Sequence, residues 1–223
     1  SWIDSFIFSS PSGILKTLAV MSRDGSLFLH TKVTLYETLV SFLLVIGISF
    51  LTATLLWIFP TVSEILEPWL VVLNSLPKSA LAPLLIVWLG SGSFTIIVAG
   101  MSVAVFGSII SMYTAFRETD SEKIKLIHTL GGGKREALCY VIFPSSLPSV
   151  ISILKVNIGL CLVGVIIGEF LAAREGLGYL IIYASQIFKL NYLITALMVL
   201  CLIALILYTI IQKFEHQIKR SRS

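Results

Sequence analysis

Residues 38–59 read TLVSFLLVIGISFLTATLLWIF and contain no Asp, Glu, Lys or Arg. A helix needs about 20 apolar residues to cross a hydrocarbon core about 30 Å thick, and this stretch has that length and composition. Uncharged runs of the same kind occupy residues 94–116 and 193–211. The three stretches predict membrane-spanning helices, so we expect the chain to be an all-α membrane protein.

The composition of the whole chain points the same way. Hydrophobic residues make up 57% and charged residues 13% of the 223 residues, and the mean hydropathy is +0.97. In water, such a chain would cover its surface with apolar side chains. The net charge of +4 is compatible with nucleic-acid binding, but the basic residues cluster beside apolar runs, where orientation in a membrane explains them. No Pro-rich or Gly-rich linker divides the chain, so residues 1–223 are treated as one transmembrane domain without a nucleic-acid partner.

Two further apolar runs carry charged residues. Residues 68–89 contain Lys78 with Pro77 and Pro83, and residues 148–173 contain Lys155 and Glu169. Both runs are therefore expected to be interrupted. Ionisable groups at membrane depth face protein or a water-filled cavity, so both runs are predicted to span the membrane and to line something. Lys78 and Glu169 are the candidates for a translocation pathway. The alternative for Glu169 is a structural pair with Arg174 or with the partner permease copy. The alternative for Lys78 is a long side chain that reaches the membrane interface, which is also the expectation for Lys155.

The basic residues predict the orientation of the chain. The loop at residues 117–147 and the tail after residue 211 hold nine of the sixteen Lys and Arg residues, and such residues are enriched in cytoplasmic loops. Two predicted spans separate the loop from the tail, so both are expected in the cytoplasm, together with the C-terminus. Five spans then leave residues 1–37 outside, as an extracytoplasmic, interfacial segment. The odd number of spans and the start at Ser1 predict a sixth, N-terminal span that is absent from this chain.

The sequence indicates neither an enzyme nor a metal site. The three cysteines and three histidines are scattered, without zinc-binding spacing or an H-E-x-x-H motif. The glycines before Lys134 do not form the phosphate-binding motif G-x-x-x-x-G-K-[ST], and no strand precedes them. No catalytic residue, metal or cofactor is therefore expected in this chain, and energy for transport would have to enter from another subunit.

The long basic loop has a regular internal pattern. Thr119 and Glu122 have the spacing of a capping box. Ile124, Ile127 and Leu130 follow at i, i+3 and i+6, which predicts one apolar stripe on a short helix. Such a helix fits either the membrane surface or a groove on a partner protein.

The end of this short helix is also predicted. The glycines at 131–133 are expected to stop it, and a second short helix is expected at residues 134–141. Pro144 and Pro148 would then turn the chain back towards the membrane. The loop is thus predicted to be a helix, a glycine elbow and a second helix.

This loop resembles the EAA loop of binding-protein-dependent ABC importer permeases, in which Glu-Ala-Ala is followed by three residues, a glycine, nine residues and Ile-x-Leu-Pro. Here Gly131 is followed by nine residues and then by VIFP at 141–144, while KLI at 125–127 replaces Glu-Ala-Ala. Other stretches resemble the nitrate, sulfonate and taurine branch of these permeases, and they are LPKSALAPL at 76–84, WLG at 88–90, GEF at 168–170 and GLG at 176–178.

The resemblance implies a type I importer fold in a bacterial inner membrane, with two permease copies forming the translocation pathway. Each copy would present residues 119–135 to a cytoplasmic ATPase dimer that binds ATP and Mg²⁺, and an extracytoplasmic binding protein would deliver the solute. That solute would be a small organic anion such as a sulfonate or nitrate-like ion, or a vitamin precursor. The residues expected to couple the permease to the ATPase are Ile124, Ile127, Leu130, Gly131 and Pro144.

Two other functions remain open on the sequence alone. An ATPase-independent secondary transporter or channel would be favoured by inverted repeats, and no convincing repeat is visible. A membrane scaffold without transport fits poorly with charged, proline-broken spans. Adjacent genes for an ATPase and a secreted binding protein would separate the importer from both.

Overall fold

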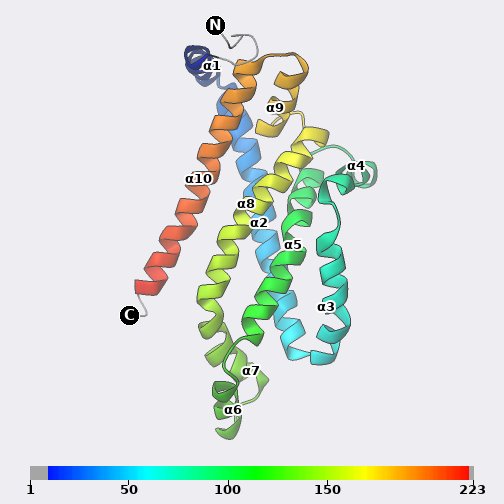
Figure 1. The fold of residues 1–223 in the computed structure, drawn as a ribbon, viewed down its shortest axis with the longest axis vertical. Helices are drawn as coiled ribbons and strands as arrows, with labels where there is room; N and C mark the ends of the chain where they lie inside the picture. Colours follow the sequence, from blue (N-terminus) through cyan, green and yellow to red (C-terminus); the bar gives the residue numbers. More distant parts are fainter. Residues whose placement is uncertain (1–9, 221–223) are drawn as a thin grey trace, which may run out of the picture. The chain divides into compact units, whose positions relative to one another are not determined.

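The computed structural model describes residues 10–220, with side chains up to residue 217. Every regular element in this range is helical (Figure 1). The first helices are α1 (Pro11–Arg23), α2 (Ser26–Ile58), α3 (Pro60–Ser75), α4 (Lys78–Leu89) and α5 (Ser93–Arg117). They are followed by α6 (Ser121–Thr129), α7 (Lys134–Ala137), the π-helical turn η1 (Leu138–Ile142), α8 (Phe143–Ala172), α9 (Leu177–Gln186) and α10 (Leu190–Arg220).

Four helical runs of the described chain are long and apolar enough to cross a membrane, and a bent pair of helices is a candidate for a fifth. The four are α2, α5, the continuous run Lys134–Ala172 and α10 up to Gln217. The bent pair is α3 with α4, whose axes differ by 93°. The predicted all-α membrane fold is therefore confirmed, with up to five candidate spans among the described residues.

The span predicted at residues 68–89 is wrong in its boundaries. The helix already begins at Pro60, because a proline ring fits the first turn of a helix. It breaks at Leu76, whose backbone is extended with ψ of 139°, as expected for a residue that precedes a proline. The expected interruption is thus real, but it is a corner between two helices rather than a defect within one.

The helix that contains the span predicted at residues 38–59 begins well before that span. Residues 26–37 belong to α2, which is 33 residues long. A separate helix, α1, precedes it, capped by the Ser10 hydroxyl oxygen, which accepts a hydrogen bond from the Gly13 amide at 3.1 Å. Gly25 joins α1 to α2 with a positive φ of 77°, which glycine adopts without a steric penalty. Residues 1–9 of the predicted interfacial segment lie outside the described residues.

The helices group into two compact units, each assembled from three stretches of chain. The first unit comprises the chain up to Phe42, Pro77–Val103 and Ile158–Tyr208, and the second comprises Leu43–Leu76, Ala104–Asn157 and the chain from Thr209. α2, α5, α8 and α10 each contribute residues to both units. No linker in the sequence therefore marks the division, which is why the sequence suggested one domain.

The second unit has an aromatic and aliphatic core. Phe116 is fully buried, with its ring edge-on to Phe50 at a centroid distance of 6.0 Å and 5.7 Å from the ring of Phe143. These pairs have the separations that aromatic rings prefer. The buried cluster around them consists of Ala53, Leu56, Ile109, Met112, Tyr113, Phe116, Leu138 and Ile142.

The first unit brings α5 and α8 together through glycines. A Cβ atom on Gly164 would lie 2.8 Å from the Gly100 Cα atom, so only glycine allows this approach. Small residues at such contacts are typical of helices packed within membranes. The close packing fixes α8 against α5 and so sets the position of Glu169 further along α8.

Candidate functional site

The helix predicted in the basic loop is α6, but its cap is not the predicted one. The carboxylate of Asp120 accepts a hydrogen bond from the Glu122 amide at 2.9 Å. The hydroxyl of Thr119, the residue expected to cap the helix, has no hydrogen-bond partner within the described part of the chain. A carboxylate interacts more favourably with the positive end of a helix dipole than a hydroxyl does, which explains why the cap lies one residue later.

The glycines end α6 as predicted. Gly131 has φ of 83°, a left-handed conformation that is common just after helices and favours glycine. The Gly132 amide donates a hydrogen bond to the Ile127 carbonyl oxygen at 2.9 Å. A Cβ atom on Gly132 would lie only 2.6 Å from the Ile127 side chain. The two glycines therefore have different tasks, a turn and a close approach.

The predicted turn at the prolines is wrong. α7, η1 and α8 form one helical run from Lys134 to Ala172, and Pro144 is the second residue of α8. Proline is tolerated in the first turn of a helix, but it cannot donate to the carbonyl group four residues earlier. The π-helical turn directly before it, in which the Phe143 amide donates to the Leu138 carbonyl oxygen, accommodates this missing hydrogen bond.

Two contacts within the second unit hold the loop in place. Ile124 packs against the buried cluster around Phe116. The Lys134 ammonium group donates a hydrogen bond to the Ile58 carbonyl oxygen at 2.9 Å. Ile58 is the last residue of α2, where the helix dipole is negative and attracts a cation. α6 is therefore fixed to the unit that carries it.

The exposed apolar face of α6 differs from the predicted stripe. Ile124 and Ile127 are half-buried, whereas Leu126 and Leu130 expose 58% and 76% of their surface. These two leucines are four residues apart and so lie on one side of the helix. Leu126 was missed because the sequence shows an apolar residue at each of 124, 126, 127 and 130, and only the packing of Ile124 reveals which of them face inwards.

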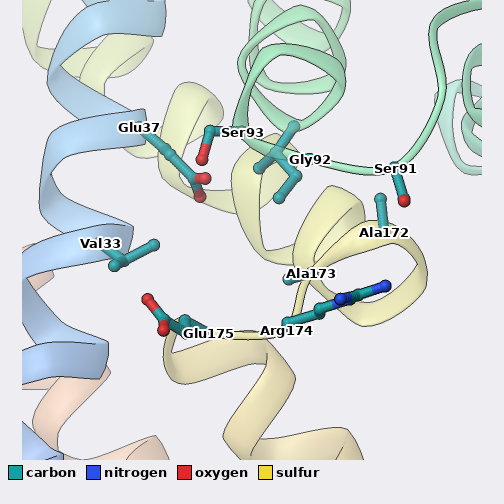
Figure 2. Close-up of a pocket in the computed structure, with 10 residues that line it drawn as sticks. Val33, Glu37, Ser91, Gly92, Ser93, Ala172, Ala173, Arg174 and Glu175 are labelled. Atoms are coloured by element: carbon teal, nitrogen blue, oxygen red, sulfur yellow. The ribbon is translucent and has the colours of Figure 1, made fainter.

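The first unit contains a cavity of about 450 Å³ (Figure 2). Glu37 of α2 is fully buried, and its side chain points into this space, with the Ser93 hydroxyl directed towards its carboxylate (Figure 2). Neither carboxylate oxygen of Glu37 has a hydrogen-bond partner within residues 10–217. The complete lining consists of Val33, Glu37, Ser91, Gly92, Ser93, Ile96, Ala172, Ala173, Arg174 and Glu175.

Glu169 of α8 does not line this cavity, and hydrogen bonds hold its carboxylate. Its carboxylate accepts hydrogen bonds from the Thr34 hydroxyl at 2.6 Å and from the Gly178 amide at 2.5 Å. Thr34 in turn accepts a hydrogen bond from the Leu177 amide at 2.8 Å. A carboxylate at the N-terminus of a helix, here α9, is stabilised by the helix dipole and by the free amides of the first turn. Glu169 therefore ties α2, α8 and α9 together.

The GEF stretch at 168–170 supplies the carboxylate of this contact, and the GLG stretch at 176–178 supplies the backbone that lies against it. Gly176 has φ of 114°, and a Cβ atom there would overlap the Glu169 carboxyl carbon. A Cβ atom on Gly178 would lie 2.8 Å from the Glu169 Cβ atom. Both glycines are thus required by the carboxylate that lies against them.

The two predicted pathway residues have different surroundings. Glu169 is 1% exposed and does not line the cavity, while Lys78 is half-buried at the start of α4 and does not line it either. The residue that sequence reasoning missed is Glu37. Glu37 directly precedes the uncharged run at 38–59, a position that is typical of the boundary of a span. In the structure it lies inside α2, so it is a charge within the helix.

Comparison with known proteins agrees with this architecture. A family model described as "Binding-protein-dependent transport system inner membrane component" matches residues 45–220. A probable ABC transporter permease protein of Haemophilus influenzae is 31% identical over 212 residues, which cover 95% of this chain and 86% of the relative.

The names of two further relatives include a solute. A putative aliphatic sulfonates transport permease protein of Bacillus subtilis is 22% identical over 221 residues, covering 99% of this chain and 80% of the relative. A formylaminopyrimidine transport permease protein of Halalkalibacterium halodurans is 27% identical over 207 residues, which cover 92% of this chain and 83% of the relative. Among solved structures, a chain of the MetNI methionine ABC transporter in an inward-facing conformation superposes with a TM-score of 0.71 at 20% identity, over 86% of this chain and 93% of that one.

Proposed function

The chain belongs to the binding-protein-dependent transport system inner membrane components, and from this premise we propose how its parts act in an ABC importer. As a member of this family it is a multi-pass membrane permease that transports a solute and is not an enzyme. It has no cofactor of its own, and the ATP would be bound by a partner ATPase.

We propose that α6 is the coupling helix and that Leu126 and Leu130 contact the ATPase. The observation that carries this proposal is their exposure of 58% and 76% on a helix whose other side is fixed to the second unit. An apolar pair on a short anchored helix fits a hydrophobic groove on a partner protein. The ATPase side of the membrane would then be the cytoplasm, with the C-terminus on the same side.

The other predicted coupling residues would support this contact. Ile124 and Ile127 would position α6 through packing, and Gly131 would provide the turn that sets its direction. Pro144, at the start of α8, would lie where movement of the loop passes into a membrane-spanning helix. The segment from 119 to 135 would thus act as one rigid attachment to α8.

The solute pathway would lie between two copies of this chain, and a secreted binding protein would deliver the solute from outside. Lys78, at the corner between α3 and α4, stays a candidate for contact with the solute. Glu169 would act indirectly, by holding α2, the helix that carries Glu37, against α8 and α9. Small organic anions such as sulfonates, or vitamin precursors, are the solutes we propose, in keeping with the sulfonate and formylaminopyrimidine named for the relatives.

Co-purification with the ATPase tests the coupling role. In membranes that contain the whole importer, the double variant Leu126→Asp with Leu130→Asp should lose the ATPase, while the yield of permease stays unchanged. The matched control is Leu15→Asp, an equally exposed leucine of α1, which should retain it. An ATPase that stays bound to the double variant would refute the assignment of α6 as the coupling helix.

Thermal unfolding tests the positioning role of Ile124. Because Ile124 packs on the buried cluster of the second unit, Ile124→Ala should lower the midpoint of thermal unfolding, whereas Leu126→Ala should not. Truncation of a packed isoleucine typically costs about 2 kcal/mol or more.

A further inference from the structure

We propose that the cavity beside Glu37 is a binding site for the protonated amine of a small organic solute. The inference rests on the proposed function, because a solute pathway gives such a site a purpose. It narrows the proposed organic anions and vitamin precursors to those that also carry an amine, and it names a recognition residue that lies outside the sequence-predicted site.

The first step of the argument is the state of Glu37. Its side chain is 0% exposed, and both carboxylate oxygens lack a hydrogen-bond partner within the described side chains. A charged carboxylate is costly to bury unless a cation or hydrogen-bond donors pair with it. Glu37 is aimed into the cavity (Figure 2), so the missing partner belongs there.

The second step is the charge around the cavity. Glu175 also lines it, with its carboxylate directed towards α2 below Val33 (Figure 2). The carboxylate of Glu169 is close enough to interact with that of Glu37 and is itself occupied by Thr34 and Gly178. The side chain of Arg174 points away from Glu37 (Figure 2). The end of the cavity at Glu37 therefore favours a positive charge.

The third step separates an organic cation from a metal ion. The cavity volume of about 450 Å³ is far larger than one ion needs and falls in the range of about 300–1,000 Å³ typical of small-molecule sites. The described residues contain no group of three or more His, Cys, Asp or Glu placed to hold a metal. Val33 and Ile96 give the lining an apolar part. An ammonium group has three donors, enough for the two Glu37 oxygens and the Ser93 hydroxyl, while the solute body contacts the apolar side.

Three probes with one shared body test the proposal. Benzylamine, benzyl alcohol and benzoate differ only in the charge and donors of the head group. Their binding to the permease with its ATPase in nanodiscs, without ATP, is measured by saturation-transfer NMR, and empty nanodiscs give the background. Benzylamine should bind above background, and the alcohol and the acid should not.

The variant Glu37→Gln keeps the shape of the side chain and removes its charge, so it should weaken benzylamine binding roughly tenfold or more. The control Glu64→Gln, which changes an exposed glutamate of α3, should bind as the wild type does. Should Glu37→Gln fail to fold, Val33→Phe fills the cavity from its wall without changing any charge, and it should reduce benzylamine binding similarly.

Equal binding of benzylamine and benzyl alcohol, or equal binding by wild type and Glu37→Gln, would overturn the proposal. Displacement of benzylamine by an equimolar amount of potassium chloride would assign the site to an inorganic cation and also overturn it. Absence of binding by any of the three probes would also overturn the proposal, and it would indicate that Glu37 and Glu169 share a proton instead. The ATPase co-purification described above does not depend on Glu37, so the failure of either proposal is visible without the other.

Discussion

At the scale of single residues, Thr34 is the point where three helices are joined. Its hydroxyl donates to Glu169 of α8 and accepts from the Leu177 amide of α9, and the side chain is fully buried. Thr34→Val keeps the shape but leaves a carboxylate oxygen and an amide unpaired. We expect a loss of about 3 kcal/mol, measured as a lower midpoint of thermal unfolding in detergent.

A second threonine of α2 supplies the control for this prediction. Thr54 donates only to the Phe50 carbonyl oxygen of its own helix, a bond that contributes little to stability. Thr54→Val should therefore stay within about 0.5 kcal/mol of the wild type. Equal effects of the two substitutions would show that the contact among α2, α8 and α9 adds no more to the free energy of unfolding than a hydrogen bond within one helix.

The same network shows how far the sequence can lead at this scale. A charge inside an apolar run identified Glu169 as significant, because burial of a carboxylate in a membrane always requires an explanation. Its partners could not be predicted, since Thr34 lies 135 positions away and threonine is common in such helices. Glu37 could not be predicted as a buried residue, because a charge at the end of an apolar run is typical of the end of a membrane span.

At the scale of elements, one ion pair joins α8 to α10 within the second unit. The Lys155 ammonium and Glu215 carboxylate are 2.6 Å apart, with only 19% and 11% of their side chains exposed. The expectation that Lys155 extends to the membrane interface stays a prediction, and the pair adds a partner for its ammonium group. Lys155→Met should destabilise the protein by about 3–5 kcal/mol, because it removes the cation paired with a largely buried carboxylate.

The double variant Lys155→Met with Glu215→Gln removes both charges and should recover most of this loss. Thermal unfolding of the wild type, both single variants and the double variant gives the coupling energy. Additive single effects would mean that the pair contributes no mutual stabilisation.

Elements were predictable where their cause is local. Uncharged runs predicted the spans, the dipeptide Leu76-Pro77 predicted a break, and the glycines at 131–133 predicted the end of α6. The π-helical turn before Pro144 and the start of α2 at Ser26 were not predictable, because each depends on how neighbouring turns share hydrogen bonds or on packing within a unit. The inward face of α6 likewise required the contact of Ile124.

At the scale of the whole molecule, the basic loop predicts the orientation in the membrane. Cys139 is exposed and lies between α7 and α8, Cys161 is buried, and Cys201 is exposed only within the apolar span of α10. A membrane-impermeant thiol reagent should therefore modify Cys139 alone, in inverted vesicles and not in intact cells. Cys139→Ser should abolish the signal. Labelling of Cys139 in intact cells would place the loop outside and contradict the proposed topology.

Site-directed photo-crosslinking from α6 tests the central claim most directly. A benzophenone amino acid in place of Leu130, introduced into cells that express the whole importer, should on illumination form an adduct with a protein that mass spectrometry identifies as an ABC ATPase. The same group in place of Leu15 should not form it. Adducts at position 130 with lipid alone, or with proteins that bind no ATP, would contradict the account of this chain as a permease driven through α6.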